Sequence, residues 1–358
     1  DIAEAIVAMH ATKGGLFTKE DIANYHGKWE EPLTGSYENY TFFANGTWCQ
    51  GAVLPMTLQI LEGIDLLSMG HNSPLYMHTV LQAIELAMAD KETYFGDPDF
   101  IDVPMTGLLS KEYAASRRSQ MTNVAFNEMA PYGNPINFQD VRYVPQVSDV
   151  DVAVYKNNRK EISIGKDTSY ISIIDQAGNA VSLTPSDFPQ SPMVDGLGLT
   201  LGNRMTQFRL DATHPNALEP GKRPTITPNA SMVFKDGEFY MTFGTPGGDM
   251  QTQALVQVFL NHIIFGMDIQ EAIEAPRFRS LNWPDSFSPH EYHPGTIILE
   301  ESLYQTHRQA MINLGYRVEV EEEWAPEFGG VCAIIQDTLN NLLIGGADPR
   351  QESLAKGK

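Results

Sequence analysis

The stretch that most constrains this chain is 166–175, where a polar, irregular loop becomes a strand. Apolar residues then alternate with others as in a half-buried strand, with Ile171 and Ile173 on the same face. A turn follows at 176–179, and a second apolar run at 180–184 returns as the partner strand. We therefore expect the chain to enter a buried hairpin here.

Thr168 lies at the entrance to this hairpin. A strand-initiating Thr is usually structural. If the Asp167–Thr168 bond were cut, however, Thr168 would carry a free α-amine beside its own hydroxyl, which unites a nucleophile and a base in one residue. In this interpretation the Thr168 hydroxyl first attacks the carbonyl of Asp167, and the resulting ester hydrolyses. The freed Thr168 then attacks a substrate amide through an acyl-enzyme.

A set of short motifs runs along the chain in a fixed order. They are Thr168-Ser169-Tyr170, Asp175 to Ser182, Gly221-Lys222-Arg223-Pro224, Gly244-Thr245-Pro246-Gly247-Gly248, Ala275-Pro276-Arg277-Phe278 and Ala347-Asp348-Pro349-Arg350. Together they resemble the gamma-glutamyltranspeptidase family of N-terminal-nucleophile hydrolases. Segments 14–21 and 95–100 resemble the large subunit of that family. Any one motif would be weak, but the ordered set covers almost the whole chain.

Periodicity and turn residues predict layered α/β (α+β) structure with an antiparallel sheet. The predicted elements are helices at about 2–12, 52–67, 74–92, 250–265, 269–275 and 303–314, hairpins within 32–45, 168–184 and 231–245, and strands at 317–322, 331–337 and 341–345. The resemblance sharpens this to a four-layer αββα sandwich. It also implies that 1–167 is the mostly helical C-terminal part of a large subunit and 168–358 the small catalytic subunit, together one intertwined domain.

The start of the chain reads as the interior of a globular sequence, without an initiator Met or a signal peptide. The resemblance implies that the large subunit of the family carries a further upstream segment, which supplies an Arg that holds the carboxylate of the substrate. We expect this chain to lack that segment.

Gly247 and Gly248 lie between a predicted strand and a predicted helix, where backbone N–H groups can point at one spot and stabilise an oxyanion. The alternative is a tight turn that needs positive φ. The resemblance also places Ser186 where the family has a second hydroxyl that supports the amine of the nucleophile and takes part in processing. The alternative for Ser186 is a surface-loop serine.

The segments that would bind substrate depart from the family pattern. Phe188 replaces an Asn, Ile226 and Thr227 replace paired serines, and Gln207 replaces an Asp that pairs with the γ-glutamyl ammonium. A neutral amide cannot give an ammonium the charge-assisted bond that it needs. The added Arg204 could hold a carboxylate, or it could simply be solvated. These changes favour a branch that acts on another amide, as an acylase or small amidohydrolase.

Composition excludes several other classes of function. A net charge of −21 argues against nucleic acid and anionic membrane surfaces. Cys49 and Cys332 fit no zinc pattern, and prolines on both sides of the His290–His293 segment prevent a helix from aligning these two as ligands. The most apolar run, 52–67, is interrupted by polar residues. We expect neither metal nor organic cofactor, and the compartment stays open.

The sequence therefore predicts an autoprocessing threonine-nucleophile amide hydrolase or acyltransferase that acts on a small-molecule amide. Its two fragments would form a heterodimer after self-cleavage, with further oligomerisation left open. Three functions remain: a glutathione hydrolase type acting on γ-glutamyl compounds, the same machinery on a different amide, and a non-catalytic relative that serves as a binding module.

Overall fold

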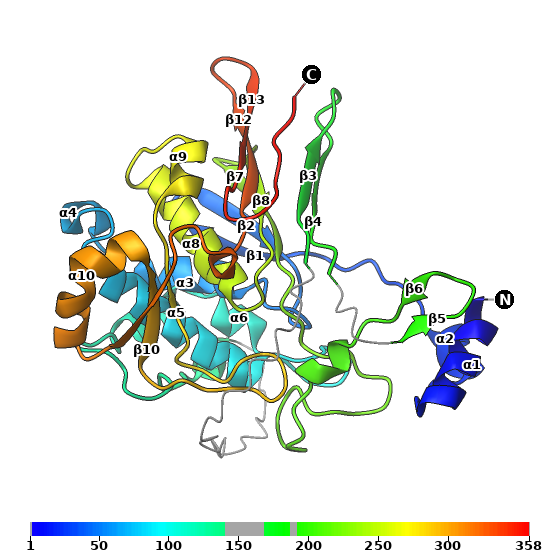
Figure 1. Ribbon diagram of the computed structural model, residues 1–358. Coiled ribbons are helices and arrows are strands. Elements are labelled where there is room, and N and C mark those ends of the chain that lie inside the picture. The colour runs from blue at the N-terminus through cyan, green and yellow to red at the C-terminus, as the bar shows by residue number, and fades with distance from the viewer. Residues whose placement is uncertain (1, 140–167, 187–191, 358) are drawn as a thin grey trace.

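The computed structural model describes residues 2–139, 168–186 and 192–357 (Figure 1). Its main body is a six-stranded antiparallel sheet in the order β1-β2-β7-β8-β12-β13. The strands are β1 (Leu33–Tyr37), β2 (Tyr40–Ala44), β7 (Ala230–Lys235), β8 (Glu238–Gly244), β12 (Cys332–Asp337) and β13 (Leu342–Ala347). The first half of the chain thus contributes two strands to a sheet that the second half completes.

Helices pack on one face of this sheet (Figure 1). They include α3 (Val53–Leu61), α5 (Pro74–Tyr94), α8 (Met250–Ile263) and α9 (Ile269–Glu274). Phe259 of α8 is the aromatic centre of the core, because its ring makes edge contacts with Tyr40 and Phe42 of β2 at centroid distances of 5.4 and 4.9 Å. Aromatic pairs at such distances add to the free energy gained by burial.

Helix α5 runs through the interior and is buried along nearly its whole length. Its start is well defined, since the Ser73 side chain accepts a hydrogen bond from the Tyr76 amide and Pro74 occupies the first turn. Lys91 and Glu92, in its last turn, are also buried. Charges in such surroundings need partners, and both find them on loops from the second half of the chain.

A second, three-stranded sheet holds β9 (Phe278–Ser280), β10 (Thr296–Glu300) and β11 (Arg317–Glu321). Strand β10 pairs with β9 antiparallel but with β11 parallel. This pair departs from the expected antiparallel pattern. Helix α10 (Glu301–Asn313) lies between the two strands in sequence and provides the crossover that a parallel pair requires.

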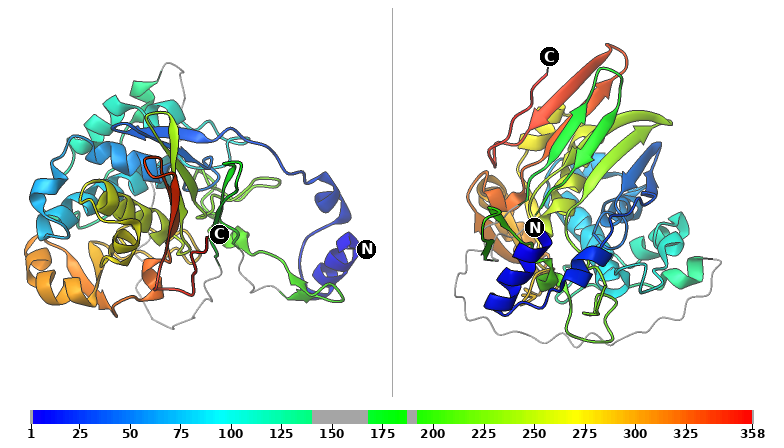
Figure 2. Two further views of the ribbon diagram at one scale, coloured as in Figure 1. Left: turned by 90° about the horizontal axis from the view of Figure 1, so that it is seen from above. Right: turned by 90° about the vertical axis from the view of Figure 1, so that its right-hand side faces the viewer.

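The hairpin β3 (Ile171–Ile174) and β4 (Ala180–Leu183) covers the other face of the six-stranded sheet (Figures 1 and 2). Tyr170, just before β3, lies against Gly244, and its hydroxyl lies 3.1 Å from Thr242 Oγ1. The predicted alternation is confirmed, but the prediction of a buried hairpin is wrong for one face. The outward side chains of Ile171, Ile173, Val181 and Leu183 are 44–55% exposed, because the sheet covers only the opposite face.

A small satellite lies apart from the main body (Figure 2). It consists of α1 (Ile2–Lys13), α2 (Lys19–Asn24), β5 (Met193–Val194) and β6 (Leu199–Thr200). Ile6 and Met9 of α1 and Val194 of β5 form its core. Helix α2 begins with a capping box, since Thr18 and Asp21 exchange hydrogen bonds.

The predicted helix at 52–67 is wrong in its second half. Gly63 adopts φ +80°, so the chain leaves α3 at Leu61 and resumes as α4 (Leu66–Met69). The remaining short helices are α6 (Met105–Leu108), α7 (Lys111–Arg118) and the 3-10 turns Pro135–Phe138, Arg204–Gln207 and Pro326–Phe328. None of the helices in the described ranges is both long and apolar enough to span a membrane.

Two of the motifs noted in the sequence meet in a buried ion network. Arg277 pairs with Asp348 at 2.7 Å, and Arg350 pairs with Glu300 at 2.6 Å and with Asp348 at 3.2 Å. All four side chains are at most 1% exposed. Alternating charges satisfy one another here, so these Pro-Arg motifs tie the ends of the small sheet and the six-stranded sheet together.

Glu85 predicts a pH-dependent stability. This buried carboxyl on α5 accepts a hydrogen bond from Ser280 at 2.6 Å, and burial raises its pKa from 4.5 to about 7. The folded chain keeps a proton that the unfolded chain releases, so the free energy of unfolding should fall as pH rises from 4.5 to about 7. Each pKa unit contributes about 1.4 kcal/mol. Urea unfolding at several pH values measures this effect. Glu85→Gln should flatten the fall of the unfolding free energy with pH, whereas Glu20→Gln at an exposed position should not. An equal dependence on pH in both variants would contradict the role of Glu85.

Candidate active site

Thr168 and Ser186 face each other where the β3–β4 hairpin begins and ends. An antiparallel bridge joins the two residues, and the Ser169 amide donates to the Pro185 carbonyl at 2.9 Å. This register places Thr168 Oγ1 2.6 Å from Ser186 Oγ, with both residues half-buried. The hydroxyl pair expected from the sequence is therefore brought together. Asp167 lies outside the described residues.

Arg204 approaches the same pair from the 3-10 turn Arg204–Gln207. Its Nη2 donates to Ser186 Oγ, and its Nη1 donates to Gln207 Oε1 at 3.1 Å. A guanidinium can only donate, so Ser186 Oγ is the acceptor in this bond. A permanent positive charge thus lies one hydroxyl away from Thr168. Gln207 itself is 1% exposed, which leaves its amide behind Arg204.

Phe287 links Arg204 to the glycine pair. The guanidinium carbon of Arg204 lies 5.9 Å from the centroid of the Phe287 ring. Phe287 Cε2 lies 3.4 Å from the position that a Cβ on Gly248 would occupy. The contacts therefore run from Thr168 through Ser186, Arg204 and Phe287 to Gly248, and the site is one continuous cluster.

Gly247 and Gly248 form the turn between β8 and α8. Their φ values are +130° and +58°, a region that residues with a Cβ rarely adopt. Their carbonyls accept from the amides of Met250 and Gln251 at 3.0 and 3.1 Å. Within the described part of the chain neither glycine N–H donates a hydrogen bond, so both remain available to another acceptor.

Ile226 and Thr227 lie beside this turn, although their contacts are structural. The Ile226 amide donates to the Trp48 carbonyl at 2.9 Å. Thr227 is 1% exposed, and its carbonyl accepts from Gln50 Nε2 at 2.8 Å. The same Gln50 nitrogen donates to the Gly248 carbonyl at 2.9 Å. A substrate contact for the two residues stays a prediction, as does one for Phe188, which lies outside the described residues.

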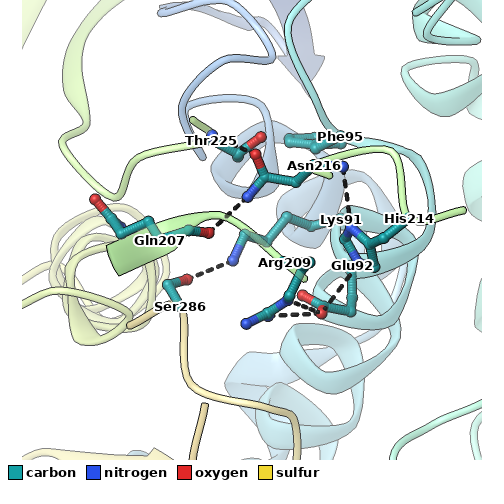
Figure 3. Close-up of a pocket in the computed structure, with 9 residues that line it drawn as sticks. All are labelled: Lys91, Glu92, Phe95, Gln207, Arg209, His214, Asn216, Thr225 and Ser286. Carbon is teal, nitrogen blue, oxygen red and sulfur yellow. Dashed lines mark hydrogen bonds and ion pairs between the residues drawn. The ribbon is translucent and has the colours of Figure 1, made fainter. Parts of the chain in front are cut away.

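Gln207 also lines a small polar pocket, together with charged residues from both halves of the chain (Figure 3). Arg209 pairs with Glu92 at 2.6 Å. Burial alone would raise the pKa of Glu92, but Arg209 and His214 outweigh it and hold that pKa far below its ordinary value. Asp285, whose backbone carbonyl accepts from Arg209, lies nearby, and burial together with the neighbouring Asp249 carboxylate raises the pKa of its side chain.

Several residues of this region were not predicted from the sequence, and four of them form the surroundings of the glycine turn. They are Lys91, Asp249, Ser286 and Phe287. Asp249 immediately follows the glycine pair, and an acidic residue at the start of a helix reads as an ordinary N-cap. The other three lie on a core helix and in an aperiodic loop, where only tertiary contacts reveal a role.

The cysteines and histidines form no metal site in the described ranges, where no group of three or more His, Cys, Asp or Glu side chains gathers. Cys49 is buried, which raises the pKa of its thiol to about 12. His290 lies against Arg209, and burial together with that cation lowers its pKa. His290 is therefore a neutral structural partner near neutral pH.

Comparison with known proteins decides the family. Residues 1–357 match the family described as Gamma-glutamyltranspeptidase. The chain belongs to the gamma-glutamyltranspeptidase family. It is 30% identical over its whole length to the glutathione hydrolase-like YwrD proenzyme of Bacillus subtilis, and 29% identical over 99% of its length to the acylase ACY 1 proenzyme of a Pseudomonas species.

Solved structures of similar proteins share this fold. The chain matches a structure titled LmbA2991T421A with a TM-score of 0.86 and 32% identity over 98% of its length. It matches the cephalosporin acylase of Bacillus halodurans with a TM-score of 0.81 and 28% identity over its whole length. The fold is therefore the mixed α/β fold of these relatives. The chain spans 61% and 58% of the lengths of the YwrD and ACY 1 proenzymes.

Proposed function

We propose that this protein is an autoprocessing threonine-nucleophile amide hydrolase or acyltransferase. The observation that carries the proposal is the Thr168–Ser186 hydroxyl pair, 2.6 Å apart at the start of β3 in a chain of this family. Thr168 Oγ1 attacks the carbonyl carbon of Asp167, and the peptide nitrogen of Thr168 leaves as its α-amine. Water then hydrolyses the ester between Asp167 and Thr168 Oγ1, which separates fragments 1–167 and 168–358.

The freed Thr168 carries out the second reaction. Its α-amine takes the hydroxyl proton as Oγ1 attacks the substrate amide, and the amine product leaves from the tetrahedral intermediate. The N–H groups of Gly247 and Gly248 hold the oxyanion of that intermediate. Water or an acceptor amine then releases the acyl group. Ser186, held by Arg204, fixes the hydroxyl of Thr168 through both steps.

The two fragments form a heterodimer around one shared core in this proposal. The helices on one face of the six-stranded sheet and the β3–β4 hairpin on the other support a four-layer αββα sandwich as the arrangement of the full-length protein. In that arrangement fragment 1–167 is the end of the large subunit and fragment 168–358 is the small catalytic subunit.

Arg204 favours an acyl donor other than a γ-glutamyl group. A γ-glutamyl substrate presents an α-ammonium, which a neighbouring guanidinium repels most strongly where water is excluded. Gln207 cannot offset this repulsion, because its amide is neutral and supplies no negative charge. A carboxylate, by contrast, can bind a guanidinium through charge-assisted hydrogen bonds. We therefore propose an acylase that prefers acyl groups bearing a carboxylate and no free α-amine.

Thr168→Ala should leave the full-length protein uncut, because no hydroxyl remains to attack Asp167. Thr168→Ser should still be cut, and Thr41→Ala, a strand threonine of β2, should be cut as the wild type is. Intact-mass spectrometry distinguishes one chain from two fragments. An uncut wild type would favour the non-catalytic binding module, and a cut Thr168→Ala would assign cleavage to an external protease.

Gly248→Ala should reduce turnover of an amide by ~10²-fold or more, the scale expected when one oxyanion donor is displaced. The alanine must adopt φ +58°, and its Cβ would lie 3.4 Å from Phe287 Cε2. Gly237→Ala is the matched control, since Gly237 has φ +88° in the β7–β8 turn with nothing within 4 Å of a Cβ. If kcat falls equally in both variants, backbone strain and not oxyanion binding explains the loss.

Substrate preference can be measured with two anilides of the same chain length, γ-glutamyl anilide and glutaryl anilide, which differ only in the α-ammonium. We expect a higher kcat/KM for the glutaryl compound with the full-length wild type. Arg204→Gln combined with Gln207→Asp should reverse the preference, whereas Arg308→Gln on α10 should leave it unchanged. A wild type that prefers the γ-glutamyl compound would contradict the acylase assignment and leave the threonine mechanism standing.

A further inference from the structure

Asp249 occupies the N-cap position of α8, directly after the glycine pair, but makes no side-chain capping bond to that helix. Its carboxylate turns sideways instead. Oδ2 accepts from the Ser286 amide at 2.8 Å, and Oδ1 accepts from Ser286 Oγ at 2.6 Å. Only 10% of the Asp249 side chain is exposed. An Asp at an N-cap usually stabilises its own helix, but the Asp249 carboxylate here binds the neighbouring loop that contains Ser286.

Lys91 completes this arrangement from α5. Its ammonium donates to Ser286 Oγ at 2.7 Å and lies 3.7 Å from Asp249 Oδ1 (Figure 3 shows Lys91 directed at Ser286). Its side chain is 5% exposed. Because Lys91 can only donate, the Ser286 hydroxyl accepts a hydrogen bond from Lys91 and donates its own hydrogen bond to the Asp249 carboxylate. A buried cation and a nearly buried anion are thus joined through one hydroxyl.

The glycine turn is also held from its other side. Gln50 Nε2 donates to the Gly248 carbonyl at 2.9 Å. Phe287, next to Ser286 in sequence, packs beside Gly248. The glycine turn is therefore held on two sides. Gln50 fixes the carbonyl of Gly248, and the loop that contains Ser286 fixes the carboxylate of Asp249.

We propose that Asp249, acting through Ser286 and Lys91, is a positioning residue that orients the amides of Gly247 and Gly248 toward the oxyanion. The inference rests on the proposed function. Two consecutive glycines have more backbone freedom than any other pair of residues, whereas oxyanion donors act only when they are preorganised. The Asp249 anchor supplies the rigidity that the glycines lack, and Lys91 extends this anchor to a helix from the first half of the chain.

Kinetics of full-length variants test this role. Asp249→Asn and Ser286→Ala should each lower kcat for an amide by ~10-fold or more, part of the loss expected for a missing donor, with KM within about 2-fold. Lys91→Arg, which keeps the charge, should retain more of kcat than Lys91→Met. A change confined to KM, or equal kcat for the two Lys91 variants, would overturn the positioning role.

Asp90→Asn is the matched control for stability. Asp90 precedes Lys91 on α5 and pairs at 3.0 Å with the buried side chain of Arg117 on α7. This variant should lower Tm and leave kcat unchanged. If kcat falls no more in Asp249→Asn than in Asp90→Asn, Asp249 contributes to the stability of the fold and not to the positioning of the glycine amides.

Hydrogen exchange separates this inference from the proposed function. In an uncut Thr168→Ala background, which needs no turnover, the amides of Met250 and Gln251, which donate to the two glycine carbonyls, should exchange faster with Asp249→Asn than with Asp90→Asn. Equal exchange would overturn the anchor even if the wild type is an active hydrolase. If the wild type cleaves no amide, the proposed function fails, and the exchange measurement alone still decides whether Asp249 holds the turn.

Discussion

Paired charges at the buried end of α5 join this helix to two segments of the second half of the chain. Lys91 pairs with Asp249 and Glu92 pairs with Arg209, in surroundings where an unmatched charge would cost several kcal/mol. Each pair joins the helix to a different loop of the second half. The loops therefore cannot shift independently, and α5 acts as the common support of the whole region.

The candidate site depends on this support because its parts come from separate elements. Thr168 enters from the hairpin on one face of the six-stranded sheet, whereas Gly248 belongs to a turn at the end of β8. Arg204 and Phe287 fill the space between them. The region therefore has two ends, a positive charge beside the hydroxyl pair and a glycine turn beside an aromatic ring. In the proposed mechanism the first end would bind an anionic group of the substrate, and the second would stabilise the charge that develops during reaction.

Much of the fold could be predicted from local pattern. Helix α5 carries its own start signal at Ser73 and Pro74, and the hairpins follow from alternation and turn residues. The proximity of Thr168 and Ser186 follows from hairpin register together with the family resemblance. Local pattern could not show which face of β3 is covered, because covering depends on the neighbouring sheet. It also could not show that Asp249 binds Ser286, because a helix-capping residue and a lateral anchor have the same sequence signature.

The continuous six-stranded sheet has a consequence for any cut between residues 167 and 168. Strand β2 precedes that bond and β7 follows it, yet they are hydrogen-bonded neighbours from Tyr40–Lys235 to Phe43–Met232. Pulling the pieces apart would split an interior ladder and bring Phe42 into water. The dissociation constant of the two fragments would therefore be set by the stability of the fold itself. Dilution alone should not separate the two fragments after such a cut.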